Sequence, residues 1–484
     1  MTTTATIDET RTTLDEAGQS HLLAFIDELD EASRAGLLAQ IGAIDFEAIP
    51  GLIEKYVTTD STYAVPDDLE PAPFYPRDHE GGSRPWDRDA MARVGESLIA
   101  AGKVGCFTVA GGQGSRLGYD GPKGCYPTTP ITQKPLFQIF AEGILANRRR
   151  HGVVIPWYIM TSPLNHDETV AFFQKHRHFG LDPNDVMFFM QGTMPAFDKK
   201  TGKILLAGKG TIATAPDGHG GAITALHASG ATADMIKRGV EHISYWQVDN
   251  PSINVLDPVF IGLHATAADS SGEMSAKMLP KSNASEKVGV FCTSEIEGER
   301  RTMVVEYSDL PDELAGATNA DGSLRFLSGS PAIHMVGVAF IEKVAKDPAF
   351  SLPYHRAVKK VAHVDPATGD AIEPDEPNAV KLERFVFDAV PMAARSIVLE
   401  ADRVEEFAPV KNKEGVDSIL TSKQLQTERA ARWLEAAGTT VPRKADGSAD
   451  CVIEISPLTA LSADDLIGWD ELPESIAPGE TVLL

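Results

Sequence analysis

The spacing of hydrophobic residues changes along the chain, and this change predicts where helices give way to a sheet. Residues 16–56 carry apolar side chains three and four positions apart, which is typical of amphipathic helices. Residues 65–88 are rich in Pro and Asp and predict an irregular connection. From about residue 100, short apolar runs alternate with helix-like segments. The runs predict strands over 104–110, 154–160, 186–191 and 242–248, with helices over 135–149, 167–176 and 221–229.

This alternation predicts an α/β fold in which a mainly parallel central sheet has both faces covered by helices. Later apolar runs, at 273–279, 288–292 and 302–307, have little helix between them and predict an antiparallel extension of the sheet. After about residue 400 the chain becomes acidic and less regular. We therefore expect a helical N-terminal segment over 1–95, a central α/β domain over 96–400 and a small C-terminal domain over 401–484.

Composition narrows the possible partners of the protein. The net charge of −25 over 484 residues argues against nucleic-acid binding, which needs a basic face. No apolar run approaches the roughly 20 residues that span a bilayer, and the polar N-terminus does not resemble a signal peptide. We expect a cytoplasmic protein without a membrane partner. The four cysteines are scattered, which argues against disulfides and structural zinc, and Cys106 and Cys292 are expected to be buried thiols.

A glycine-rich loop follows the first predicted core strand. Residues 109–118 read VAGGQGSRLG, and residues 121–124 continue as GPKG. In an open α/β sheet, ligands bind beyond the carboxyl ends of the strands. Glycines there let backbone N–H groups approach phosphate oxygens, and Arg116 and Lys123 add positive charge to the same loop. The loop is a candidate phosphate-binding site, although glycines in such a turn are often purely structural.

Two common nucleotide-binding patterns fail on spacing. A dinucleotide fingerprint that starts at Gly112 needs a third glycine at position 117, which is Leu117. The Walker pattern fails because no Gly-Lys-Ser/Thr occurs in the loop. An oxidoreductase with a Rossmann cofactor site is therefore disfavoured.

Together with other segments, the loop resembles the eukaryotic-type UDP-sugar pyrophosphorylases, especially the UDP-N-acetylhexosamine pyrophosphorylases. The likeness covers nearly the whole chain. It is carried by Gly111–Gly118, Pro122–Gly124, Ala17–Leu23, Phe188–Gly192, Ala215–Gly221, Val248–Asn250, Val304–Ser308, Lys381–Asp388, Phe407–Asn412 and Glu454–Leu458. The resemblance implies a Rossmann-like nucleotidyltransferase sheet of the GT-A-like type. It also implies an enzyme that joins UTP to a sugar 1-phosphate and releases pyrophosphate and a UDP-sugar.

The resemblance assigns the charged residues to the two phosphate groups. Arg116 and Lys123 are expected to grip the triphosphate, and Lys411 to approach the α-phosphate from the C-terminal side. Asp249 ends the strand at 242–248, and a carboxylate there is well placed to hold Mg²⁺ against the phosphates. The alternative for Asp249 is an Asx-type turn before Pro251. Mg²⁺ is the only cofactor that we expect.

Uracil and sugar contacts are also implied by the resemblance. Gln191 matches the uracil-contacting Gln of the family, and the backbone of Gly218, Val109, Gly111 and Gly112 is expected to complete the nucleotide site. The expected sugar-binding residues are Gly289, Glu306, Phe385 and Phe387, with His219 and Ser330 at two positions where the chain departs from the family pattern. On periodicity alone, the two phenylalanines are more often core.

The two departures leave the sugar open. His219 stands where the acetylhexosamine enzymes carry Asn, and the Gly-His-Gly string is similar to glucose-specific and broad-specificity enzymes. Ser330 stands where Asn is expected. N-acetylglucosamine 1-phosphate is the first choice of substrate, and glucose 1-phosphate or a broader range is the alternative. A non-catalytic UDP-sugar-binding regulator is a further hypothesis, which the presence of all four charged residues disfavours.

Overall fold

The computed structural model describes residues 7–59, 65–80, 84–347 and 352–484, so part of the predicted connection at 65–88 lies outside the described residues. The chain divides into two compact units. Unit 1 comprises residues 1–64, 192–221 and 351–386, and unit 2 comprises 65–191, 222–350 and 387–484. This grouping cuts across the boundaries expected from the sequence, because two internal segments fold with the N-terminal helices.

Unit 1 combines short helices with small sheets. Its elements are α1 (Ile7–Glu16), α2 (Glu31–Gly42), α3 (Ile49–Leu52), β5 (Thr193–Pro195), β6 (Phe197–Asp198), β7 (Leu206–Gly208), β8 (Thr211–Ile212), β9 (Thr214–Pro216), β16 (His355–Lys359), β17 (His363–Val364), β18 (Ala371–Ile372) and β19 (Ala379–Glu383). The apolar residues of the predicted helical region bury a core with β6, β8 and β19, which includes Leu22, Leu37, Ile41, Phe197 and Leu382. The predicted amphipathic helices are confirmed, although they are short and broken by 3₁₀ turns.

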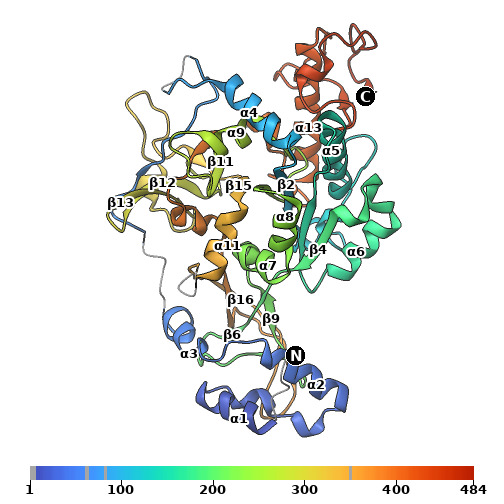
Figure 1. Cartoon of the computed structure of the whole chain (residues 1–484). Helices are drawn as coiled ribbons and strands as arrows, with labels where there is room; N and C mark the ends of the chain where they lie inside the picture. The colour runs from blue at the N-terminus through green and yellow to red at the C-terminus, as the bar shows by residue number, and fades with distance from the viewer. Residues whose placement is uncertain (1–6, 60–64, 81–83, 348–351) are drawn as a thin grey trace. The chain divides into compact units, whose positions relative to one another are not determined.

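Unit 2 contains a mixed sheet and its helices (Figure 1). Its elements are β1 (Glu70–Pro71), α4 (Arg88–Ala100), β2 (Val104–Val109), α5 (Leu136–His151), β3 (Trp157–Thr161), α6 (His166–Lys175), β4 (Val186–Met190), α7 (Ala222–Ala228), α8 (Ala231–Arg238), β10 (His242–Gln247), α9 (Pro258–Thr266), β11 (Met274–Pro280), β12 (Val290–Ile296), β13 (Glu299–Val305), α10 (Asp312–Ala315), β14 (Ser328–Gly329), β15 (His334–Gly337), α11 (Val338–Lys346), β20 (Val398–Glu400), α12 (Arg403–Glu406), α13 (Ile419–Ala436), β21 (Val452–Glu454) and β22 (Thr481–Leu483).

The sheet has a parallel part and an antiparallel part. Its order is β1-β12-β14-β11-β15-β10-β2-β3-β4, with β13 paired to β12 and β20 to β11. Strands β10, β2, β3 and β4 are parallel neighbours, and β15 pairs antiparallel with both β10 and β11. The predicted α/β fold with a mixed central sheet is confirmed, and the antiparallel part is larger than the sequence indicated.

Both faces of the parallel strands are covered because their side chains alternate between two helical layers. Trp157 and Trp246 point into an aromatic core with Phe137 and Phe140 of α5. On the opposite face, the hydroxyl of Tyr158 donates to Asp234 of α8 at 2.8 Å. Figure 1 shows α5 and α6 on one side of β2 and β4, and α7, α8 and α11 on the other. Fully buried parallel strands of this kind read as continuous apolar runs, which is why the sequence revealed them.

Helices α4 and α9 lie side by side, and a glycine on each helix lets the two backbones come close together (Figure 1). A Cβ atom on Gly95 would lie 1.9 Å from the carbonyl oxygen of Pro258, and one on Gly262 would lie 1.9 Å from that of Met91. Only glycine permits this approach, so the contact fixes the pair of helices against the sheet.

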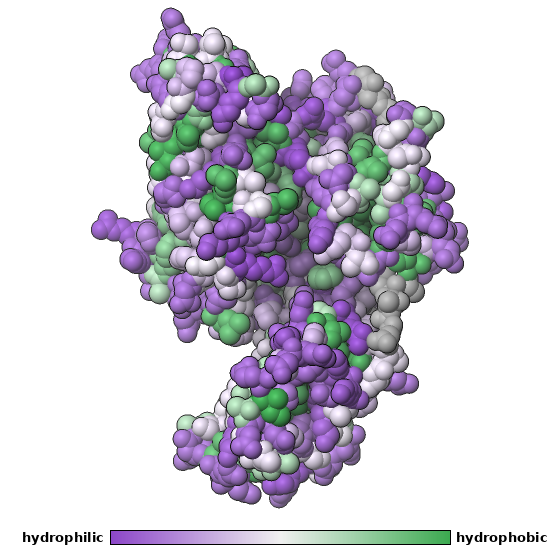
Figure 2. All heavy atoms as spheres, turned by 180° about the vertical axis from the view of Figure 1, so that it is seen from behind, coloured by the Kyte–Doolittle hydropathy of each residue, from purple (hydrophilic) through white to green (hydrophobic). Residues whose placement is uncertain are grey.

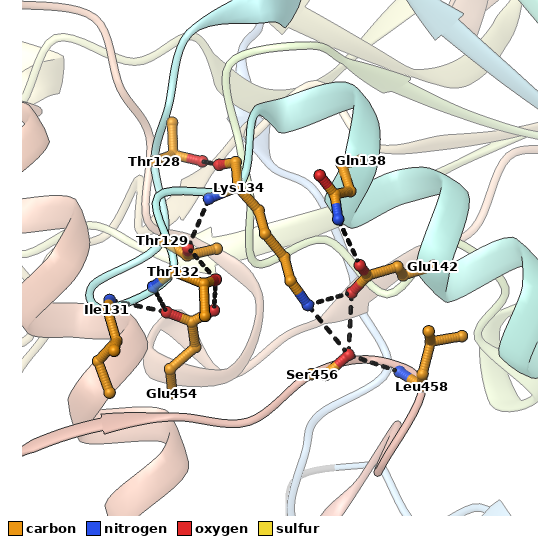
Figure 3. A network of polar contacts seen from close by, with 10 residues as sticks. All are labelled: Thr128, Thr129, Ile131, Thr132, Lys134, Gln138, Glu142, Glu454, Ser456 and Leu458. Carbon is orange, nitrogen blue, oxygen red and sulfur yellow. Dashed lines mark hydrogen bonds and ion pairs between the residues drawn. The ribbon is translucent and has the colours of Figure 1, made fainter. Parts of the chain in front are cut away.

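The C-terminal part of unit 2 has its own small core, and a polar network ties it to α5 and to the loop before α5 (Figure 3). The carboxylate of Glu454 accepts from the backbone N–H groups of Ile131 and Thr132 at 2.7 and 2.8 Å. The ammonium of Lys134 binds the carboxylate of Glu142 at 2.8 Å and the hydroxyl of Ser456 at 3.3 Å. The loop that these residues hold lies between Lys123 and α5. The long helix α13 corrects the expectation of an irregular region after residue 400.

The surface of the molecule is mostly polar on the face that Figure 2 draws. Hydrophilic residues cover most of the face drawn in Figure 2, and hydrophobic residues gather there only in small groups. All four cysteines are buried thiols, as predicted for Cys106 and Cys292. Among the described residues, no helix has the length and apolar character needed to cross a membrane.

Candidate active site

The carboxyl ends of four parallel strands meet at one edge of the sheet of unit 2, and several predicted site residues lie there. Asp249 follows β10, the glycine loop follows β2, and Gln191 follows β4. Strand pairing extends beyond the strands, since the N–H of Val248 donates to the carbonyl of Val109 at 3.0 Å and that of Gln191 donates to Thr161 at 2.8 Å. Asp249, the loop and Gln191 therefore lie next to one another along this edge.

The loop folds back on itself, and this brings Lys123 beside its first glycines. The N–H of Lys123 donates to the carbonyl of Gly112 at 3.1 Å, and that of Gly114 donates to Gly121 at 2.9 Å. Arg116 lies in the 3₁₀ turn η4 (Ser115–Leu117), which ends at Gly118 with a φ of 70°. Lys123 begins a second turn, η5 (Lys123–Cys125). Among the residues that the structure describes, neither cation has an ion-pair partner, so both are available for an anionic ligand.

A side chain that the sequence analysis missed supports this loop. Asn165, only 1% exposed, donates its amide to the carbonyls of Ala110 and Gly112 at 2.9 and 3.2 Å. Its Oδ1 accepts from the N–H of Ser162 at 2.8 Å. Asn165 comes four residues after the end of β3. The rule that polar residues past a buried parallel strand lie at the ligand edge would have identified it.

Gln191 lies against the loop where a base is expected to bind. A Cβ atom on Gly111 would lie 2.2 Å from its Oε1 atom, so glycine is needed at position 111 for Gln191 to keep this place. Gln191 is 7% exposed. A buried amide with this orientation presents both a donor and an acceptor at the rim of the loop, which is the complement of an imide edge.

The C-terminal cation reaches the same edge through backbone bonds. The N–H of Val410 donates to the carbonyl of Asp249 at 2.8 Å. Lys411 therefore directly follows a residue that is hydrogen-bonded to the candidate metal ligand. A Cβ atom on Gly118 would lie 3.8 Å from the side chain of Lys413, which places the same segment beside the loop. The ammonium of Lys411 lies 3.3 Å from the carboxylate of Asp417. The structure thus groups Arg116, Lys123, Lys411 and Asp249 around one loop.

Asp249 fits a magnesium ligand. Its side chain accepts no hydrogen bond and forms no ion pair within the described parts of the chain, although its backbone is fixed by Val410. No group of three or more His, Cys, Asp or Glu side chains among the described residues forms a ready-made metal site. Mg²⁺ binds one or two carboxylates together with phosphate oxygens and water, so a single hard oxygen ligand beside a candidate phosphate-binding loop suits this ion.

Three of the predicted sugar-binding residues also lie together in unit 2. The N–H of Ser330 donates to the carbonyl of Gly289 at 2.8 Å, and a Cβ atom on Gly289 would lie 3.5 Å from Oε1 of Glu306. Gly289 directly precedes β12, and Glu306 directly follows its partner β13. Phe387 is a buried residue of the same unit, with 5% of its surface exposed.

The remaining predicted residues, Gly218, His219 and Phe385, form a cluster in unit 1. The ring of His219 stacks on that of Phe385 at 5.1 Å, and its Nδ1 accepts from the N–H of Val386 at 3.1 Å. Gly218 has a φ of 84° and packs against the backbone of Arg384. Arg384 pairs with Asp217 at 2.6 Å, and burial raises the pKa of this carboxyl although the guanidinium opposes the shift. The loop is thus fixed to the strand end that carries Phe385.

A cavity of about 500 Å³ in unit 2 does not coincide with this site. It is lined by Pro251–Val255, by Arg429 and Trp433 of α13, and by residues of α5 and α9, and not by Arg116, Lys123, Lys411 or Asp249.

Comparison with known proteins gives the family. The UTP–glucose-1-phosphate uridylyltransferase family matches residues 88–439, well over half of the chain. The chain belongs to this family. It is therefore a nucleotidyltransferase of the UDP-sugar pyrophosphorylase type, and the resemblance drawn from its motifs is confirmed.

Individual relatives are similar over most of their length. The chain is 37% identical over 413 residues to UDP-N-acetylglucosamine diphosphorylase 2 of Arabidopsis thaliana, covering 82% of this chain and 77% of the relative. It is 36% identical to the human UDP-N-acetylhexosamine pyrophosphorylase-like protein 1, covering 96% and 94%. The crystal structure of the UDP-N-acetylglucosamine pyrophosphorylase of Trypanosoma brucei, in complex with an inhibitor, has a TM-score of 0.78 at 25% identity and covers 98% of both chains.

Proposed function

We propose that this chain transfers the uridylyl group of UTP to N-acetylglucosamine 1-phosphate and releases pyrophosphate. The observation that carries this proposal is the grouping of Arg116, Lys123, Lys411 and Asp249 around one glycine loop in unit 2. A net charge of −25 repels a nucleoside triphosphate, so local cations are needed to overcome that field. The names of relatives at 34–37% identity support N-acetylglucosamine as the sugar.

The proposed reaction is an in-line displacement at the α-phosphorus of UTP. An oxygen of the sugar phosphate forms the new P–O bond, and the bond between the α-phosphorus and the bridging oxygen breaks as pyrophosphate leaves. Both reactants are anions, so catalysis consists of alignment and charge neutralisation, without a covalent nucleophile. Arg116 and Lys123 bind the pyrophosphate portion, and Lys411 stabilises the charge on the α-phosphate. Bound at Asp249, Mg²⁺ supplies further neutralisation of the phosphate oxygens.

Recognition of the two substrates is assigned to the flanking residues. Gln191 and the backbone from Val109 to Gly112, all in unit 2, recognise uracil. Gly289, Glu306 and Ser330 of unit 2 bind the sugar hydroxyls, and Phe387 of the same unit contacts the acyl group. A Cβ atom on Gly289 would lie 3.5 Å from Oε1 of Glu306, so the two residues are close enough for one sugar hydroxyl to contact both.

A second substrate, glucose 1-phosphate, is favoured by one observation. His219 accepts from the N–H of Val386 and stacks on Phe385, so an imidazole occupies the place where the acetylhexosamine enzymes resembled here carry an amide. An imidazole with one nitrogen already engaged offers at most one hydrogen-bonding atom to a sugar, whereas an amide offers a donor and an acceptor.

A pyrophosphate-release assay tests the proposal. The protein is incubated with UTP, Mg²⁺ and one of four sugar 1-phosphates: N-acetylglucosamine, N-acetylgalactosamine, glucose or galactose. We expect the highest kcat/KM with N-acetylglucosamine 1-phosphate. A preference for glucose 1-phosphate reverses the choice of sugar, and no product with any of the four supports a non-catalytic regulator.

The metal is tested in the same assay. Removal of divalent cations with EDTA is expected to abolish turnover, and Mg²⁺ in excess restores it. Asp249→Asn is expected to raise the Mg²⁺ concentration needed for half-maximal rate, because a neutral amide is a weaker ligand than a carboxylate. Asp257→Asn is not a suitable control because Asp257 pairs with buried Lys277. Asp120→Asn, in the same loop region but exposed, is the matched control.

A further inference from the structure

Lys411 stands on a stretch of chain without regular structure. Residues 407–418 lie between α12 and α13 and belong to neither helix nor strand. We call residues 406–411 the Lys411 segment. Because residues 407–411 of this segment have no helical or sheet ladder of their own, their position depends on the groups that satisfy their backbone N–H and C=O groups.

Asn250 satisfies two of these groups at once. Its Nδ2 donates to the carbonyl of Glu406 at 2.6 Å, and its Oδ1 accepts from the N–H of Ala408 at 3.0 Å. Asn250 is 5% exposed, so the bonds are shielded from water. The carbonyl of Asp249 accepts from Val410, as described above. Two adjacent residues after β10 thus hold alternate residues 406, 408 and 410, much as a neighbouring strand would.

The same segment is held from two other directions. The ammonium of Lys277, which is 1% exposed, binds the carboxylate of Glu406 at 2.6 Å and that of Asp257 at 2.6 Å. The hydroxyl of Ser422 in α13 donates to the carbonyl of Ala408 at 2.6 Å. Asn250 directly follows Asp249. Its side chain therefore joins the Lys411 segment to the end of β10.

We propose that Asn250 is a positioning residue for uridylyl transfer, which sets Lys411 in register with Asp249. The two groups assigned to the phosphates are then carried on one frame, although they are far apart in the sequence. The inference rests on the proposed function. Loss of the amide removes the two hydrogen bonds that tie residues 406 and 408 to the end of β10, and Lys411 shifts relative to Asp249. A shift of about 1 Å in a catalytic group is enough to cost about 10²-fold in rate.

Steady-state kinetics on the full chain test this role. The variants are Asn250→Ala, Asn250→Asp, Lys411→Ala and the double variant Asn250→Ala with Lys411→Ala. The matched control is Asn147→Ala, since Asn147 is equally buried at 3% exposure, and its amide donates at 2.9 Å to Gly143 within the single helix α5. Each is measured for kcat, for KM of UTP and for its melting temperature.

We expect Asn250→Ala to lower kcat about 10- to 100-fold, with KM for UTP changed less than about threefold. The double variant is expected to be no slower than Lys411→Ala alone, because Asn250 acts through Lys411. Asn147→Ala is expected to lower the melting temperature and leave kcat unchanged. Asn250→Asp keeps the acceptor for Ala408 but loses the donor to Glu406, so its kcat falls between those of wild type and Asn250→Ala.

Three results overturn the proposal. The first is a folded Asn250→Ala with wild-type kcat, and the second is a double variant in which the two losses multiply. If Asn250→Ala does not fold, Asn250→Asp is measured in its place. The third refuting result is a wild-type kcat in Asn250→Asp. A wild-type protein without turnover on any sugar 1-phosphate refutes the proposed function instead, whereas an active wild type confines a negative result to Asn250.

Discussion

The position of Lys123 depends on a glycine that contacts the aromatic core, and this contact gives a sharp prediction. A Cβ atom on Gly124 would lie 2.1, 2.2 and 2.6 Å from three ring carbons of Phe137. Ordinary carbon–carbon contacts are about 3.5 Å or longer, so the shortfall is about 1.4 Å. Gly124→Ala therefore forces either the ring or the loop to move.

The ring is the less movable of the two. Phe137 is fully buried, and its centroid lies 4.9 Å from that of Phe173 and 6.3 Å from that of Trp157. In a close-packed core such a ring has no space to enter. The loop is expected to yield by about 1 Å and to carry Lys123 with it, which costs about 10²-fold in kcat. The overpacking itself costs about 1–3 kcal/mol of stability.

The assay is pyrophosphate release under saturating substrates, corrected for the folded fraction from a thermal melt. Gly42→Ala is the matched control, because a Cβ atom there meets nothing within 4 Å. Adding Phe137→Leu to Gly124→Ala removes the two nearest ring atoms and is expected to restore part of the activity. A folded Gly124→Ala with the wild-type rate refutes the reasoning, as does a double variant no more active than Gly124→Ala.

The other predictions concern charge, sugar choice and pH. Lys123→Ala is expected to lower kcat about 10²- to 10³-fold with an unchanged melting temperature, and near-normal turnover would contradict the loop assignment. His219→Asn is expected to raise the kcat/KM ratio of N-acetylglucosamine 1-phosphate over glucose 1-phosphate; an unchanged ratio removes His219 from the sugar site. Burial lowers the pKa of His264 well below 6.5, and neighbouring His242 adds to the shift, so only the unfolded chain gains a proton just below pH 6.5. The free energy of unfolding should then fall as pH drops below 6.5, by up to about 1.4 kcal/mol per pH unit for this group. In urea unfolding, His264→Gln should reduce this dependence of stability on pH. An unchanged pH dependence in the variant would argue against the role of His264.

The parallel half of the sheet and its loop were predictable from local pattern. A buried parallel strand reads as a continuous apolar run, and the glycines after β2 mark the place where backbone approaches a ligand. Arg116 and Lys123 lie in the loop that follows β2, and Asp249 follows the neighbouring strand β10. Their roles in the reaction stay predictions.

Other features depend on contacts between distant residues, which no local pattern reveals. The amide of Asn250 bonds to Glu406 and Ala408, more than 150 positions away. Unit 1 combines three separate segments, so no boundary along the chain marks it. Helix α13 was missed because the region is acidic overall, although Ser418 and Thr421 form a capping box at its start. Position N3 holds Thr421 and not the Glu or Gln of the usual capping-box pattern, so the start of this helix gave only a weak sequence signal.

The fate of the α-phosphate of UTP tests the assigned chemistry most directly. Phosphorus NMR of the wild-type protein with UTP, N-acetylglucosamine 1-phosphate and Mg²⁺ follows every phosphate at once. We predict that the UTP resonances give way to those of a UDP-sugar and pyrophosphate in equal amounts, and that Lys123→Ala slows this conversion about 10²-fold or more. Spectra in which UTP and the sugar phosphate persist unchanged, or in which UDP and inorganic phosphate form instead, would contradict the transfer.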